Sequence, residues 1–154
     1  MLSVFIFNHE NLITLQGDVR DKNLVIEALK DVEIVHHNVA QVPVAKNKKL
    51  FWEVNFGATK LILEEAFEQK IKKFVYTSSS AVFGVPVKNP VTEYDIPSPM
   101  EEYGKAKYEA EKICNKYSKL GMSCSIVRPR TILGNGRLGI FQILFEWIYQ
   151  NKNV

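Results

Sequence analysis

A tyrosine and a lysine one helical turn apart are the residues of this sequence best suited to proton transfer. The segment EYGKAK (102–107) places Tyr103 four residues before Lys107, and on a helix that spacing puts both side chains on one face. A free phenol ionises near pH 10, so a tyrosine acting as a base near pH 7 needs a pKa lower by roughly 3, about 4 kcal/mol. An ammonium within about 5 Å supplies much of that. Alternatively, Lys107 lies along an apolar stripe with its ammonium in water.

The chain holds a second pair of this kind, Tyr108 and Lys112, five positions further on. At roughly 100° per residue this pair points about 140° away from the first, so the two cannot serve one site. Context favours Tyr103, because FVYTSSSAVFG (74–84) places a serine cluster at the end of an apolar run. A hydroxyl there would bind the oxygen that Tyr103 deprotonates; the alternative is a turn in which the serines satisfy backbone groups.

Short apolar runs alternate with helical patterns along the chain, and this alternation predicts an α/β fold with a Rossmann-like, doubly wound parallel sheet. In such sheets ligands bind beyond the carboxyl ends of the strands. Functional residues are therefore expected in the segments 17–20, 38–44, 78–84 and 128–136, beside a proline-containing loop at 84–100. The predicted strands are Ser3–Phe7, Ile13–Gln16, Glu33–His37, Phe74–Thr77 and Cys124–Val127. The predicted helices are one capped by Asp21, Lys46–Gln69, Glu101–Leu120 before Gly121, and Phe141–Gln150.

Composition excludes several classes of protein. The 154 residues predict a single domain, 1–154, and a net charge of +3 without a dense basic tract argues against nucleic-acid binding. The apolar run LSVFIF (2–7) is too short for a signal peptide or a membrane span. Cys114 and Cys124 lack metal-site spacing, so we expect no metal and a reduced, cytoplasmic protein.

Six motifs, in order and at suitable spacing, resemble the extended branch of the short-chain dehydrogenase/reductase superfamily, namely the NAD-dependent epimerase/dehydratase proteins that act mostly on nucleotide sugars. The resemblance covers nearly the whole chain. The motifs are GDVRD (17–21), HNVAQVPV (37–44), VNFGATKLILEEA (54–66), FVYTSSSAVFG (74–84), EYGKAK (102–107) and VRPRTILGNGR (127–137).

The resemblance implies a role for each matched residue. Tyr103 is the catalytic base, Lys107 holds the cofactor ribose and lowers the tyrosine pKa, and Ser79, with Ser78 as second choice, orients the reacting oxygen. The remaining implied contacts are Asp18 and Val19 to the adenine, Val39, Ala40, Asn55 and Pro129 to other parts of the cofactor, and Ser80 and Thr131 to the substrate. The implied cofactor is NAD; NADP stays open, because Asn8 or His9 stands where the selecting residue is expected.

The sequence departs from the family pattern at Val39, Phe83, Thr131 and Asn135. Thr131 stands where an asparagine often meets the sugar nucleotide, so it bears directly on the substrate. The implied substrate is a small molecule, either a nucleotide sugar or a steroid-like or terpenoid alcohol.

GNGRLG (134–139) is the one G-x-G-x-x-G of the chain, yet a dinucleotide fingerprint needs a strand directly before it and an acidic residue about 20 positions later. Neither is present, so the motif is expected to be a substrate-side loop. Matched to the family, the sequence begins at the second strand. We therefore expect the glycine-rich loop and the C-terminal substrate-binding part to be missing, and the chain alone to bind NAD poorly and turn over little.

The last predicted helix, IFQILFEWIYQ (140–150), is apolar almost all round and is expected to be covered, either in a homodimer or by a companion chain. Three hypotheses follow for the whole chain. It is the central portion of an NAD-dependent oxidoreductase, a non-catalytic dinucleotide-binding or regulatory relative, or a non-functional gene fragment.

Overall fold

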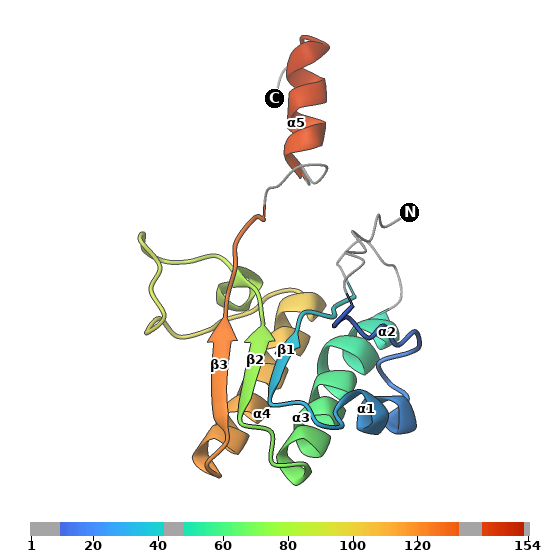
Figure 1. Ribbon diagram of the computed structural model, residues 1–154. Helices are drawn as coiled ribbons and strands as arrows, with labels where there is room; N and C mark the ends of the chain where they lie inside the picture. The colour runs from blue at the N-terminus through green and yellow to red at the C-terminus, as the bar shows by residue number, and fades with distance from the viewer. Residues whose placement is uncertain (1–9, 42–47, 133–139, 153–154) are drawn as a thin grey trace.

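The computed structural model describes residues 10–41, 48–132 and 140–152. Its centre is a parallel three-stranded sheet, as the alternation of strands and helices predicted (Figure 1). The strands lie side by side in the order β1 (Ile34–His37), β2 (Lys73–Thr77) and β3 (Ser123–Val127).

Helices precede, connect and follow these strands. They are α1 (Lys22–Ala28), α2 (Lys48–Trp52), the π-helix η1 (Glu53–Ala58), α3 (Thr59–Glu68), the short 3-10 helix η2 (Ser80–Phe83), α4 (Glu102–Lys119) and α5 (Ile140–Tyr149). The helix predicted over Lys46–Gln69 is therefore present across its described part. It is interrupted by one wide turn, η1, a kind of turn that is often found at functional sites.

Two helix ends form as their residues predict. The carboxylate of Asp21 accepts hydrogen bonds from the backbone N–H groups of Asn23 and Leu24 and so caps α1. At the other end of the domain, α4 stops before Gly121, whose φ of 100° is a conformation that glycine adopts without steric cost.

One face of the sheet carries the hydrophobic core. Phe74 and Tyr76 are fully buried, whereas Val75 and Thr77, which point to the opposite face, are only half-buried. Figure 1 shows α3 and α4 behind the sheet, and the buried side chains that they contribute to the core are Ile62, Leu63, Ala66, Ala110 and Cys114. The described helices cover this face alone.

The strand predicted over Ile13–Gln16 is wrong. These residues are irregular, and Ile13 is 86% exposed. A strand is stable only when a neighbour pairs its backbone N–H and C=O groups, and no described strand lies beside this segment. The strand predicted over Ser3–Phe7, which would be the candidate neighbour, lies outside the described residues.

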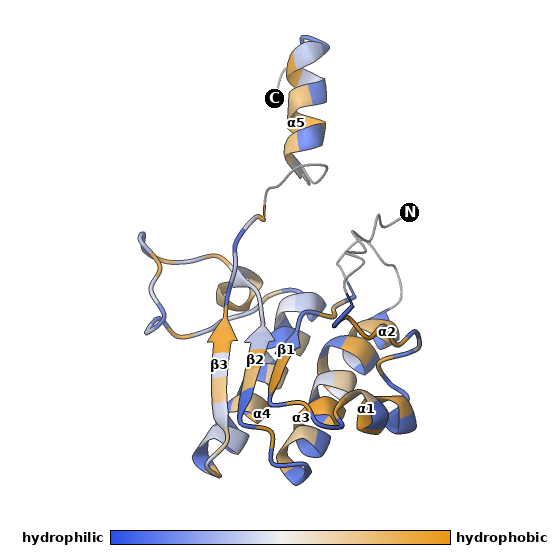
Figure 2. Cartoon of the chain, viewed as in Figure 1, coloured by the Kyte–Doolittle hydropathy of each residue, from blue (hydrophilic) through white to orange (hydrophobic). Residues whose placement is uncertain are grey.

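Helix α5 stands apart from the sheet, and hydrophobic residues occupy most of its length (Figures 1 and 2). Ile143, Phe145 and Ile148 each leave half or more of their surface exposed. The described residues therefore do not provide the cover that we expected over the apolar surface of α5. No described helix is both long and apolar enough to span a membrane.

Candidate active site

The ends of the three strands and the first turns of α4 enclose a cavity of about 1070 Å³. Seven of the residues implied by the family resemblance line it together, although they come from four segments of the chain. They are Val39, Ala40, Ser79, Tyr103, Lys107, Pro129 and Thr131. The site thus lies at the carboxyl edge of the sheet, where ligands of open α/β sheets bind.

Tyr103 lies close enough to Ser79 for the serine hydroxyl to lower the pKa of the phenol. Ser79 is held by its own turn, because its hydroxyl also accepts a hydrogen bond of 3.2 Å from the backbone N–H of Ala81 and caps η2. Tyr103 is brought close because Gly104, which follows it, packs directly on η2. A Cβ atom at Gly104 would lie only 2.6 Å from the carbonyl oxygen of Ala81. The absence of a side chain at this position lets Tyr103 approach the turn that carries Ser79.

Lys107 is buried, with only 1% of its surface exposed, so its ammonium does not extend into bulk water. The ammonium donates a hydrogen bond of 2.9 Å to the carbonyl oxygen of Thr77 and lies 4.8 Å from the centre of the Tyr76 ring. Burial lowers the pKa of Lys107 to about 8. The side chain therefore stays largely charged at neutral pH and titrates just above it.

The expected effect of Lys107 on the acidity of Tyr103 is not found. Burial raises the pKa of Tyr103 above its ordinary value, and the nearby Ser79 hydroxyl opposes this effect. Among the described residues, Ser79 rather than Lys107 thus favours the ionised phenol.

The second tyrosine–lysine pair lies elsewhere, as its angular offset predicted. The ammonium of Lys112 lies 4.6 Å from the centre of the Tyr108 ring and pairs with Glu109 at 2.6 Å. Neither Tyr108 nor Lys112 lines the cavity. This pair is part of the outer surface of α4.

Asn55 supports the cavity from behind. Its side-chain amide accepts a hydrogen bond of 2.9 Å from the backbone N–H of Gln41 and donates one of 3.0 Å to the carbonyl oxygen of the same residue. These bonds hold the segment that carries Val39 and Ala40 at the cavity wall. Asn55 is itself fully buried and is not among the residues that line the cavity, so the structure gives it a contact with Gln41 rather than with the cavity.

A second cavity, of about 670 Å³, adjoins the first and shares Ser79, Arg130 and Thr131 with it. Ser80, which was expected to contact the substrate, lines only this second cavity. Sequence reasoning missed Arg130, although it lies inside the motif VRPRTILGNGR. The signal was available, because Arg130 lies within the segment 128–136 that follows β3, and such segments lie at the ligand-binding edge.

Asp18 and Val19 line neither cavity. The carboxylate of Asp18 pairs with Arg20 at 2.6 Å, which lowers the pKa of Asp18 to about 2, and Arg20 pairs in turn with Glu53 at 2.7 Å. Val19 packs against the core. The GNGRLG segment (134–139) lies outside the described residues.

The parallel sheet and its helices define a Rossmann-like α/β protein, and Ser79, Tyr103 and Lys107 gather at the carboxyl edge of the sheet. A model of the NAD dependent epimerase/dehydratase family matches residues 5–152. The chain belongs to this family, whose members are NAD-dependent.

Three proteins illustrate what the chain is similar to. A putative UDP-glucose 4-epimerase of Methanocaldococcus jannaschii is 32% identical over 90% of this chain and 49% of its own length. A mouse sterol-4-alpha-carboxylate 3-dehydrogenase, decarboxylating, is 34% identical over 88% of this chain and 39% of its own. The crystal structure of a UDP-glucuronic acid 4-epimerase from Bacillus cereus in complex with NAD superposes with a TM-score of 0.78 at 26% identity, covering 88% of this chain and 45% of that one. The chain thus spans less than half the length of each.

Proposed function

We propose that this chain carries the redox half-site of an NAD-dependent epimerase or dehydratase that acts on a secondary alcohol. The observation that carries the proposal is that Ser79, Tyr103 and Lys107 line the same cavity at the carboxyl ends of the strands. NAD, when bound, accepts the hydride from the alcohol carbon. Tyr103 takes the hydroxyl proton, Ser79 holds the reacting oxygen, and Lys107 binds the ribose hydroxyls.

The residues present fit a nicotinamide cofactor. The cavity of about 1070 Å³ reaches the upper end of the range usual for ligand sites, as a dinucleotide requires. The hydroxyl of Ser78, only 3% exposed, lines it and has no hydrogen-bond partner among the described residues. A buried polar atom without a partner costs free energy that a bound amide or hydroxyl would recover.

A nucleotide sugar is the substrate that we favour. Arg130 stands on the wall common to both cavities, forms no ion pair within the described part of the chain, and neither cavity has an acidic residue among those that line it. A guanidinium in that position suits the phosphates of a nucleotide sugar. The alternative is a sterol-like alcohol, which the mouse relative suggests and which the threonine at position 131 would also accept.

We further place the protein in the cytoplasm, consistent with its two free cysteines, and infer that a second copy or a companion chain covers α5. The adenine contacts expected of Asp18 and Val19 and the selection of NAD over NADP remain part of the proposal. The expectation that this chain alone binds NAD weakly also remains part of the proposal.

Titration of the isotope-labelled chain with NAD, followed by NMR, tests this function. The amide signals of Val39, Ala40, Ser79 and Lys107 should shift together, with an affinity weaker than micromolar. Micromolar binding would contradict the expected weakness. Shifts confined to residues outside the cavity, or none at all near the solubility limit of NAD, would overturn the proposed function.

A further inference from the structure

Glu111 and Arg128 form a two-pronged ion pair between α4 and the residue that follows β3. The Nε atom of Arg128 donates to Oε1 of Glu111 at 2.9 Å, and its Nη2 atom donates to Oε2 at 2.7 Å. Glu111 is completely buried, and the side chain of Arg128 is 21% exposed. This geometry is the strongest that a guanidinium and a carboxylate adopt, and it fixes direction as well as distance.

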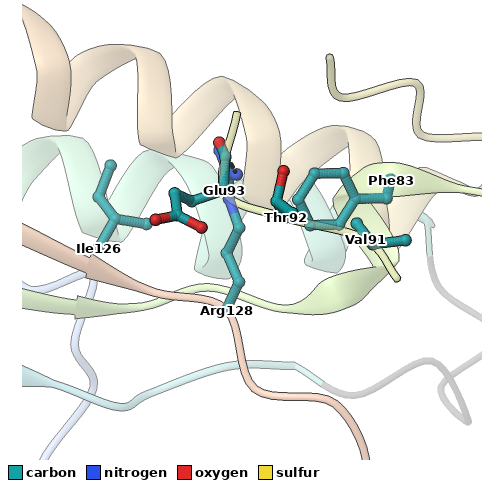
Figure 3. Close-up of a pocket in the computed structure, with 6 residues that line it drawn as sticks. All are labelled: Phe83, Val91, Thr92, Glu93, Ile126 and Arg128. Atoms are coloured by element: carbon teal, nitrogen blue, oxygen red, sulfur yellow. Dashed lines mark hydrogen bonds between the residues drawn. The ribbon is translucent and has the colours of Figure 1, made fainter. Parts of the chain in front are cut away.

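Arg128 also contacts the segment that precedes α4. Its guanidinium carbon lies 4.9 Å from the centre of the Phe83 ring in η2, and its Nη1 atom donates a long hydrogen bond of 3.5 Å to the carbonyl oxygen of Glu93. Figure 3 shows the side chain of Arg128 extending toward Glu93 and Phe83. One side chain therefore links the end of β3, η2 and the loop before α4.

The pair is placed between the two parts of the proposed site. On α4, Glu111 follows Lys107 by one turn and Tyr103 by two turns. On the other side, Arg128 precedes Pro129, whose carbonyl oxygen accepts a hydrogen bond of 2.9 Å from the backbone N–H of Ser80. Glu111 thus lies on the helix that carries Tyr103, and Arg128 lies next to the residue that bonds the backbone of Ser80.

We propose that Glu111 and Arg128 are positioning residues that hold Tyr103 opposite Ser79, so that the ion pair sets the catalytic geometry rather than the stability of the fold. The inference rests on the proposed function. Its physical basis is that desolvation offsets most of the attraction within a buried ion pair, and apolar residues of similar volume often replace such a pair without loss of stability. Apolar residues fill the same space, but their contacts do not fix the orientation of α4 relative to the end of β3.

The test compares Glu111→Leu/Arg128→Met with the parent chain. The control is Glu109→Leu/Lys112→Met, which removes an exposed ion pair of 2.6 Å from the same helix. The readouts are thermal unfolding, the titration of Tyr103 followed by NMR of ring-labelled tyrosine, and kcat and KM with NAD and UDP-glucose. The tyrosine titration does not depend on activity, so it tests the ion pair even if the proposed function fails.

We expect the core double variant to unfold within a few degrees of the parent, while the Tyr103 titration moves to higher pH because Ser79, which lowers the Tyr103 pKa, is no longer held opposite it. We expect kcat to fall about 100-fold, the loss that a misplacement of about 1 Å causes, with little change in KM. The control should match the parent. An unchanged Tyr103 titration in the folded core variant overturns the proposal. If that variant does not fold, Arg128→Lys replaces it, because lysine keeps the positive charge but cannot form the two-pronged hydrogen bonds with Glu111. If neither variant folds, the ion pair is needed for folding, and the proposal is overturned as well.

Discussion

The ammonium of Lys107 donates its hydrogen bond to the carbonyl oxygen of Thr77, at the end of β2, rather than to Tyr103. Its pKa of about 8 comes from burial. If Lys107 binds the cofactor as a cation, affinity for NAD should be constant below pH 8 and should fall above it, as the lysine loses its proton. Binding measured from about pH 7 to about pH 9 checks this. Lys107→Met should bind NAD weakly at every pH. If the affinity of the parent chain for NAD also does not change with pH, the assignment of Lys107 as a cofactor-binding cation is contradicted.

Replacement of Tyr103 by Phe should lower kcat by about 10² to 10⁴, the usual contribution of a general base, and leave the affinity for NAD nearly unchanged. The chain supplies its own control in Tyr108→Phe, because Tyr108 has the same lysine spacing but faces Lys112 on the outer surface of α4. Turnover of both variants with NAD and UDP-glucose decides the matter. Equal losses in the two variants would show that the choice between the two pairs is wrong.

Gly104→Ala should push α4 away from η2, because the new Cβ atom would stand 2.6 Å from the carbonyl oxygen of Ala81. We expect a loss of about 1–3 kcal/mol in the free energy of unfolding, measured by denaturant titration, together with lower turnover. Gly57→Ala is the matched change. Its nearest contact, 3.6 Å from the carbonyl oxygen of Trp52, is an ordinary one, so this variant should unfold close to the parent.

His37 couples stability to pH. Its Nε2 atom lies 2.9 Å from the hydroxyl of Thr59, which donates its own proton to the carbonyl oxygen of Asn55, so His37 is the donor. Burial, and secondarily the charge of Lys107, lower the pKa of His37 from 6.5 to about 4.

As pH falls, the unfolded chain therefore takes up this proton first. The stabilisation is complete above pH 6.5 and is lost as pH falls toward 4, by up to about 3 kcal/mol. His37→Gln, which cannot titrate, should show a shallower loss across that range in urea unfolding measured at several pH values. Parallel curves for variant and parent would argue against a buried neutral histidine.

Arg130→Met distinguishes the two classes of substrate. If Arg130 faces the phosphates of a nucleotide sugar, the variant should bind UDP-glucose at least about tenfold more weakly, because a charged hydrogen bond typically contributes more than 1.4 kcal/mol. Affinity for an uncharged sterol alcohol should hardly change. Calorimetric titration with both probes checks this, and unchanged binding of UDP-glucose would favour the sterol-like alternative.

Local patterns were enough to predict the parallel sheet, the cap at Asp21, the stop at Gly121 and the gathering of Tyr103, Lys107 and Ser79 at one edge. These features depend on periodicity and on the geometry shared by all parallel sheets. The strand expected over Ile13–Gln16 failed because pairing, unlike propensity, depends on a neighbour elsewhere in the chain.

The direction of the lysine ammonium was equally inaccessible from spacing. Four residues on a helix place Lys107 on the face of Tyr103, but the carbonyl of Thr77, from a different element, determines where the charge rests. The support that Asn55 gives to Gln41 was hidden for a related reason, because Asn55 bonds a backbone group 14 residues earlier in the chain and lies in the wide turn of η1, which no residue pattern predicted.

That wide turn makes the length of the α2–α3 helix a functional quantity. A π-turn holds one residue more than an α-turn. The side chains that follow it are therefore rotated about the helix axis by about 100° relative to those that precede it. Deleting Gly57 would let the helix relax into regular winding and swing the amide of Asn55 away from Gln41, with the wall formed by Val39 and Ala40 then left untethered. A single-residue deletion in a helix that supplies none of the residues lining the cavity would in this way dismantle one side of that cavity.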